Sequence, residues 1–134
     1  MVAPDGAVLL VSKGRSRRVQ GFRVPATGWG RKWVTAEALG RIPVPPGRGV
    51  RGLVTDAALS PDGTEIAVRT YVEIFFFRLA RGDTFHPLGT ACDVTGLELQ
   101  GEGLTWLPDD SFLLTSEGVF GVPGTLTLVR CAQE

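Results

Sequence analysis

The chain has 134 residues, of which 43% are hydrophobic and 21% are charged, and its formal net charge is zero. This is the composition of an ordinary globular domain. No segment approaches the roughly 20 apolar residues of a membrane helix, and the N-terminus lacks the basic region of a secretory signal. We therefore expect no membrane insertion. We expect a cytoplasmic protein, or a secreted or periplasmic one if upstream sequence is missing.

Charge is unevenly distributed along the chain. Residues 1–51 carry ten Lys and Arg against two acids, a balance of +8, whereas residues 52–134 carry four Arg against twelve acids, a balance of −8. A dipolar chain of this kind favours association between oppositely charged surfaces and says little about the fold.

A repeated turn motif is the strongest signal in the sequence. Pro4-Asp5-Gly6 recurs as Pro61-Asp62-Gly63 and as Pro108-Asp109-Asp110, and an apolar run follows each copy. Pro presets φ at the first turn position, Asp bonds the local backbone, and Gly accepts a positive φ, so each copy predicts a hairpin. The prolines lie 57 and 47 residues apart, close to the repeat of β-propeller blades.

Strands separated by Gly-rich and Pro-rich turns predict an all-β fold. In chain order, we expect strands at residues 7–12, 17–24, 33–42, 50–59, 65–70, 73–79, 85–99, 102–107, 111–116 and 125–131. A short helix at 34–39 is the alternative for the third strand, and 43–49 is a connector. The expected architecture is one incomplete propeller domain of about 2.5–3 four-stranded antiparallel blades, at about 1–49, 50–99 and 100–134.

The middle repeat carries the run Ile74-Phe75-Phe76-Phe77, which breaks the alternation of a half-exposed strand. A strand that is apolar on both faces is buried on both sides. We therefore expect the middle sheet to pack between two others. The first repeat lacks an innermost strand before Pro4, and the third stops after its third strand, so we expect a second copy, another chain or a longer parent protein to complete the ring.

Two segments carry a family resemblance. They are Val54-Thr55-Asp56-Ala57-Ala58-Leu59-Ser60-Pro61-Asp62-Gly63 and Gln100-Gly101-Glu102-Gly103-Leu104-Thr105-Trp106-Leu107-Pro108-Asp109-Asp110, followed by the strand ends Arg69-Thr70-Tyr71 and Ser116-Glu117-Gly118. They resemble bacterial β-propellers of the WD40-like and "esterase-like activity of phytase" type. The resemblance covers roughly residues 50–130 well and 3–24 less well, and it implies blades without implying a reaction. Asp110 replaces the turn glycine, so the third hairpin is expected to be atypical.

Polar residues recur at matching points of the repeats. Asp56 and Glu102 lie near the start of the expected innermost strands of their blades, at 50–59 and 102–107. Lys13 (or Ser12), Arg69 and Glu117 lie at the ends of the expected second strands, at 7–12, 65–70 and 111–116. The carboxylates of Asp56, Glu102 and Glu117 are candidates for general acid and base work, and those of Asp56 and Glu102 for holding Ca²⁺.

The candidate ligand-binding residues are Lys13, Arg69 and Tyr71, of which Lys13 and Arg69 could bind an anion. The structural alternative, which we favour, is that Asp56 and Glu102 pair with Arg69 or with backbone amides and so tie one blade to the next.

The remaining signals are weaker. Cys92 and Cys131 have no metal-ligand spacing; they are two buried thiols, which we favour, or a structural disulfide. His86 lies in an outer segment, which argues against a catalytic triad.

Arginines near Trp29 and Trp33 (Arg15, Arg17, Arg18, Arg23 and Arg31, with Lys32) make nucleic-acid binding conceivable, but a solvated surface is the simpler interpretation. We expect Trp29, Trp33 and Trp106 to pack in the core.

Two functions follow from these patterns. The first is an interaction or assembly module without catalysis of its own, whose partner is a protein or a second copy of the chain. The second is a propeller hydrolase, of esterase or phosphatase type, that uses a channel metal or acid and base carboxylates.

Overall fold

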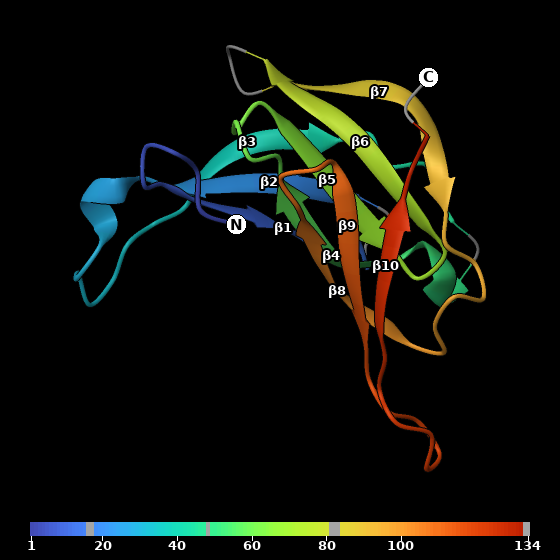
Figure 1. Cartoon of the computed structure of the whole chain (residues 1–134). Coiled ribbons are helices and arrows are strands. Elements are labelled where there is room, and N and C mark those ends of the chain that lie inside the picture. The colour runs from blue at the N-terminus through green and yellow to red at the C-terminus, as the bar shows by residue number, and fades with distance from the viewer. Residues whose placement is uncertain (16–17, 48, 81–83, 133–134) are drawn as a thin grey trace.

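Three antiparallel β-sheets make up the described part of the chain (Figure 1). The computed structural model describes residues 1–15, 18–47, 49–80 and 84–132. Within these ranges no α-helix forms, and the only helical turns are the 3₁₀ turns η1 (Ala26–Gly28) and η2 (Gly49–Gly52). Sheet A contains β1 (Val8–Val11), β2 (Val19–Val24) and β3 (Glu37–Ile42). Sheet B contains β4 (Val54–Leu59), β5 (Glu65–Thr70), β6 (Glu73–Ala80) and β7 (Thr84–Asp93). Sheet C contains β8 (Gly101–Trp106), β9 (Ser111–Ser116) and β10 (Leu126–Arg130).

Each predicted strand is present. β5 and β9 have the predicted bounds, β6, β7 and β8 each extend one residue beyond them at one end, and the other strands are shorter than predicted. The helix considered at 34–39 does not form, because β3 occupies Glu37–Ile42 and pairs with β2. The strand expected from residue 50 begins at Val54, after η2. In sheet A, Val2 pairs with Val8 of β1 in an isolated antiparallel bridge. Arg17 and Arg48 of the expected elements fall outside the described ranges.

The three Pro-Asp turns share one hydrogen bond and one backbone conformation. In each turn, the Asp carboxylate accepts a hydrogen bond from the backbone N–H two residues later, on Ala7, Thr64 or Ser111. The residue at the glycine position has a positive φ in all three copies, and Asp110 adopts φ 60° in the third. Asp and Asn tolerate this conformation better than other side chains do. The expectation that the third hairpin is atypical is therefore wrong.

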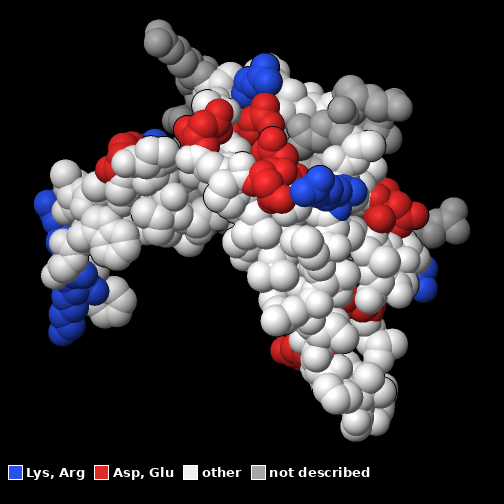
Figure 2. Space-filling view, viewed as in Figure 1, with Lys and Arg blue, Asp and Glu red and all other residues white. Residues whose placement is uncertain are grey.

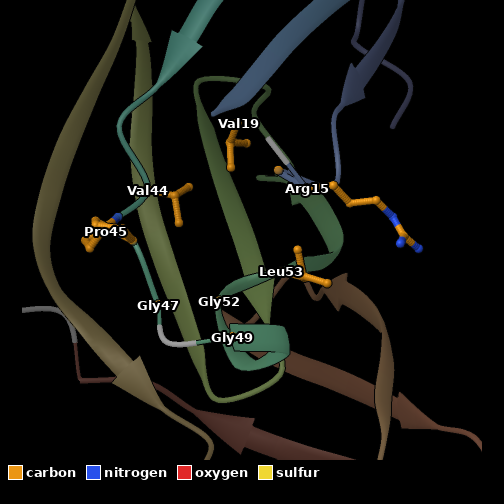
Figure 3. Close-up of a pocket in the computed structure, with 10 residues that line it drawn as sticks. Arg15, Val19, Val44, Pro45, Gly47, Gly49, Gly52 and Leu53 are labelled. Carbon is orange, nitrogen blue, oxygen red and sulfur yellow. The ribbon is translucent and has the colours of Figure 1, made fainter. Parts of the chain in front are cut away.

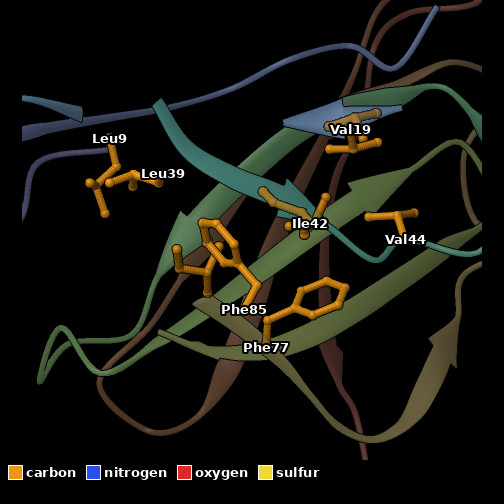
Figure 4. Close-up of a cluster of buried hydrophobic side chains, with 10 residues drawn as sticks. Leu9, Val19, Leu39, Ile42, Val44, Phe77 and Phe85 are labelled. Atoms are coloured by element: carbon orange, nitrogen blue, oxygen red, sulfur yellow. The ribbon is translucent and has the colours of Figure 1, made fainter. Parts of the chain in front are cut away.

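Sheets A and B pack face to face around the first hydrophobic cluster (Figure 4). Leu9, Leu39 and Ile42 of sheet A meet Phe77 and Phe85 of sheet B. The Phe85 ring lies directly against Gly21 of β2, where an added Cβ would come within 2.6 Å of the ring. The glycine in β2 thus makes room for the aromatic side chain of the neighbouring sheet.

Sheet B packs against sheet C through its other face. The aromatic cluster there contains Phe76 of β6, Trp106 of β8 and Phe112 of β9, with ring centroids 4.9–6.0 Å apart. Neighbouring residues of β6 therefore point into different cores, since Phe77 joins the first cluster and Phe76 the second. The expectation that the middle sheet is buried on both faces is confirmed.

A disulfide joins sheets B and C at their outer strands. Cys92 of β7 and Cys131, directly after β10, are bonded, with their Cα atoms 5.5 Å apart. The prediction that favoured two free thiols is wrong. Residues 39 positions apart become neighbours because the stacking brings the outermost strands of the two sheets together, a proximity that the sequence spacing does not reveal.

Two of the three tryptophans lie on the surface. Trp106 is buried between sheets B and C, as expected, but Trp29 is 63% exposed and Trp33 is 84% exposed. Both belong to the loop between β2 and β3, whose anchor is a hydrogen bond from Trp29 Nε1 to the carbonyl oxygen of Gly6. The prediction of core positions for Trp29 and Trp33 is therefore wrong.

In the part of the chain that is described, no helix is both long and apolar enough to cross a bilayer.

Candidate functional site

One end of the stack collects corresponding residues from all three sheets. A hydroxyl residue lies at the end of the strand that follows each Pro-Asp turn. These residues are Ser12 after β1, Thr70 in β5 and Ser116 in β9. Each hydroxyl accepts a hydrogen bond from a backbone N–H at the start of the next strand, on Gln20, Glu73 or Thr125. The residues that follow these hydroxyls, Lys13, Tyr71 and Glu117, are therefore structurally equivalent.

This equivalence corrects the expected alignment of Arg69 with Lys13 and Glu117. The second turn contains one extra residue. The Ser60 N–H donates to the carbonyl oxygen five residues ahead, on Glu65, whereas the N–H groups of Ala3 and Leu107 donate to carbonyl oxygens four residues ahead. One residue of slip moves a side chain to the other face of a strand. Arg69 consequently points between sheets B and C, and it is 1% exposed.

Arg69 forms a buried ion pair with Glu98, from the loop between β7 and β8. Each of the two side chains is 2% exposed. Arg69 Nη1 also donates to the carbonyl oxygens of Gly103, at 2.6 Å, and of Thr115, at 3.3 Å, both in sheet C. The guanidinium lies directly beside Gly101, where any side chain would overlap it. Arg69 therefore ties sheet B to sheet C and is closed off from solvent, which removes it from the candidate ligand-binding set.

Asp56 has a structural role of the same kind. Its Oδ2 accepts a hydrogen bond of 2.7 Å from the Leu104 N–H of β8, and its Oδ1 accepts one of 2.8 Å from the Ala57 N–H. The structural alternative considered for this residue, a tie to backbone amides of the next sheet, is confirmed. Asp56 and Glu102 are not equivalent, because Thr55 and Glu102 are the extra residues of matching β-bulges.

Glu102 belongs to a polar cluster near Tyr71. Glu102 Oε1 accepts hydrogen bonds from Tyr71 Oη and from Gln100 Nε2, both at 3.3 Å. Gln100 Nε2 also donates to Glu117 Oε2, at 3.1 Å, and so links the two carboxylates. Burial raises the pKa of the Tyr71 hydroxyl, and the nearby negative charge of Glu102 raises it further. Tyr71 therefore keeps its proton and donates a hydrogen bond to Glu102.

The hydrolase set of Asp56, Glu102 and Glu117 is only partly brought together. Glu102 and Glu117 share Gln100, whereas the carboxylate of Asp56 is occupied by two backbone amides. No group of three or more His, Cys, Asp or Glu side chains that could hold a metal ion occurs among the described residues. His86 lies on β7, exposed, beside Thr84.

A cavity of about 660 Å³ opens beside Tyr71. We call it the Tyr71 cavity. It is formed by the end of sheet A, by the loop before β4, by the β5–β6 turn and by the loop before β8. Its lining residues are Lys13, Arg15, Val50, Arg51, Leu53, Tyr71, Val72, Thr95, Gly96, Glu98, Leu99 and Gln100. Two of the predicted ligand-binding residues, Lys13 and Tyr71, therefore line one cavity.

A second cavity of about 560 Å³ adjoins the first one and shares Arg15 and Leu53 with it (Figure 3). Its other walls include Val19, Val44 and the Pro-Gly connector after β3. In Figure 3 the Arg15 guanidinium points away from Val44 and from the connector. The charge of Arg15 also acts on Tyr71, whose pKa it lowers against the larger effect of burial. We therefore assign the Arg15 charge to the Tyr71 cavity.

Sequence reasoning missed four residues of this end: Arg15 and Arg51 as cavity cations, Glu98 as the partner of Arg69, and Gln100 as the link between Glu102 and Glu117. One signal for Glu98 exists in the sequence. Arg69 follows the apolar run Ile66-Ala67-Val68, and an arginine that continues a buried strand needs an acidic partner.

Comparison with known proteins adds no family: no family model, no curated protein and no solved structure matches the chain.

Proposed function

We propose that the chain is an interaction module of the β-propeller type, without catalysis of its own, that binds a second copy of itself through its two outer sheet faces. The outer faces are the surfaces of sheets A and C that point away from sheet B. The proposal depends on one observation: both outer faces carry exposed apolar side chains. Leu126 is 74% exposed and Leu128 62% exposed on sheet C, and Leu10 is 44% exposed on sheet A.

On each outer face an exposed leucine lies across from an apolar side chain of the neighbouring strand. On sheet C, Leu128 lies across from Leu113, and both point away from the buried Leu114. On sheet A, Leu10 lies across from Phe22. Contiguous exposed apolar surface on a folded protein is typical of an interaction site. A sheet face of this kind is best covered by another sheet face, as sheet B covers its two neighbours.

Charge favours contact between sheet A of one copy and sheet C of the next. Among the described residues, sheet A and its loops carry mainly Lys and Arg, whereas sheet C and its flanking loops carry mainly Asp and Glu. On the face in Figure 2, acidic side chains gather near the middle of the molecule, and a basic group lies at the far left, over the β2–β3 loop. A head-to-tail contact brings opposite charges together, whereas contact between two A faces or two C faces does not. Repetition of a head-to-tail contact closes a ring or extends a filament.

Face-specific variants test the proposal. Leu10→Glu places a charge on the outer face of sheet A, and Leu128→Glu places one on that of sheet C. Each variant alone is expected to be monomeric by light scattering at concentrations where the unmodified chain associates. Mixed in equal amounts, the two variants are expected to form a dimer, since each retains the face that the other has lost.

The matched control is Leu97→Glu, which adds the same charge at a 45% exposed leucine of the loop between β7 and β8. It is expected to associate as the unmodified chain does. A mixture of Leu10→Glu and Leu128→Glu that stays monomeric would contradict the head-to-tail arrangement. An unmodified chain that is monomeric at every concentration would contradict self-association altogether.

A further inference from the structure

We propose that the Tyr71 cavity binds a small phosphomonoester that carries an apolar or aromatic body. This inference goes beyond self-association, because the cavity is lined by the loops at one end of the stack and not by the outer faces of sheets A and C. The site is therefore accessible in a single copy of the chain. A cavity of about 660 Å³ also lies within the usual range of small-molecule sites.

Three cations line the cavity: Lys13, Arg15 and Arg51. They come from two separate segments, the end of β1 and the loop before β4, which the stacking of sheets A and B brings together. The Val54 N–H donates to the Lys13 carbonyl oxygen at 3.1 Å, and this bond joins the two segments. In the described part of the chain, none of the three cations forms an ion pair. Their charges are therefore available to a ligand.

The single acid in the cavity wall does not cancel this positive charge. Glu98 Oε2 is paired with Arg69, and Glu98 Oε1 accepts a hydrogen bond from Thr125. Glu102 and Glu117 are hydrogen-bonded to Tyr71 and Gln100 and are not part of the lining. The lining thus carries three positive charges against one buried ion pair, which suits a doubly charged oxyanion better than a singly charged one.

The rest of the lining accounts for the apolar body. Val50 is 70% exposed and Leu99 72% exposed, and Leu53 and Tyr71 also line the cavity. Exposed apolar side chains beside three cations provide a surface for an uncharged group attached to the anion. An inorganic phosphate ion would contact the cations and leave this surface uncovered.

The test uses Tyr71 as a reporter, because it is the only tyrosine of the chain. The full-length protein is produced with 3-fluorotyrosine, so that it has one ¹⁹F resonance, and is titrated with phenyl phosphate, benzoate or phenol. Phenyl phosphate is expected to shift the resonance to saturation. Benzoate, with one charge, is expected to bind more weakly, and phenol, with none, is expected not to bind.

The variants separate the cavity cations from net charge. Lys13→Gln with Arg51→Gln is expected to weaken phenyl phosphate binding at least about tenfold, because charge-assisted hydrogen bonds are lost. Lys32→Gln with Arg31→Gln removes the same charge from the β2–β3 loop and is expected to change the affinity less than about twofold. The ¹⁹F chemical shift of the protein without ligand shows whether each variant folds. If Lys13→Gln with Arg51→Gln does not fold, Arg15→Gln alone takes its place.

Four results would overturn the proposal. They are no shift with phenyl phosphate, an equal affinity for benzoate, an equal effect of phenol, or an equal loss of binding in both charge variants.

Discussion

The buried pair of Arg69 and Glu98 gives the sharpest test of how sheets B and C are held together. Glu98→Gln keeps the shape of the side chain and removes its charge, which leaves the Arg69 guanidinium buried with only the neutral carbonyl oxygens of Gly103 and Thr115 as partners. Because both side chains are 2% exposed, water cannot replace the lost charge. Removing one partner of a buried pair typically lowers the free energy of unfolding by about 3–5 kcal/mol.

The measurement is urea unfolding followed by tryptophan fluorescence, since Trp106 lies between sheets B and C. The matched control is Glu65→Gln, which breaks the pair with Arg78, whose side chain is 60% exposed. Exposed pairs contribute about 0–1 kcal/mol, so the control is expected to change the free energy of unfolding by less than about 1 kcal/mol. The double variant Arg69→Met with Glu98→Gln is expected to lose less than the sum of the two single variants, because no buried charge is left unpaired. A Glu98→Gln effect no larger than that of the control would refute the assigned role of the pair.

Three further predictions concern other links of the same structure. Gly101→Ala is expected to lower the free energy of unfolding by about 2 kcal/mol or more in a urea titration, because its methyl group overlaps the Arg69 guanidinium. Cys92→Ala with Cys131→Ala is expected to lower it by about 4 kcal/mol, from the entropy of the opened loop; an equal midpoint for the unmodified chain under reducing conditions and under oxidising conditions would contradict this. Burial and the charge of Glu102 raise the pKa of Tyr71, so its contribution to stability is present below the ordinary pKa of 10.0 and is lost as the pH rises through the folded value. An ultraviolet titration of this single tyrosine is expected to show the raised pKa, and Glu102→Gln is expected to lower it.

The strands and turns of this chain could be predicted from sequence because their determinants are local. Each Pro-Asp turn carries its own hydrogen bond from the Asp carboxylate, and the apolar run after it extends the hairpin. The burial of β6 on both faces could also be predicted, since four apolar residues in succession leave no polar face.

The candidate site could be predicted only in part, because its geometry depends on register. One additional residue in the second turn moves Arg69 into the interior and leaves Tyr71 at the position of Lys13 and Glu117. Neither that residue nor the bulges at Thr55 and Glu102 can be inferred from alternation alone.

Contacts between sheets were the least predictable features. The disulfide joins residues that are distant along the chain, and the partner of Arg69 comes from a loop that was expected to continue an outer strand. The exposed positions of Trp29 and Trp33 reflect the same difficulty, because a long loop is held by only a few contacts that its sequence does not specify.

The proposed self-association depends on sheet faces that remain apolar and uncovered when the chain is alone. The most direct measurement is the weight-average mass of the unmodified chain by light scattering, over a wide range of concentration at low and at high salt. Head-to-tail stacking predicts a mass that rises above 14.3 kDa with concentration and falls again as salt weakens the attraction between the basic and acidic sides. A mass that stays at 14.3 kDa throughout would contradict it.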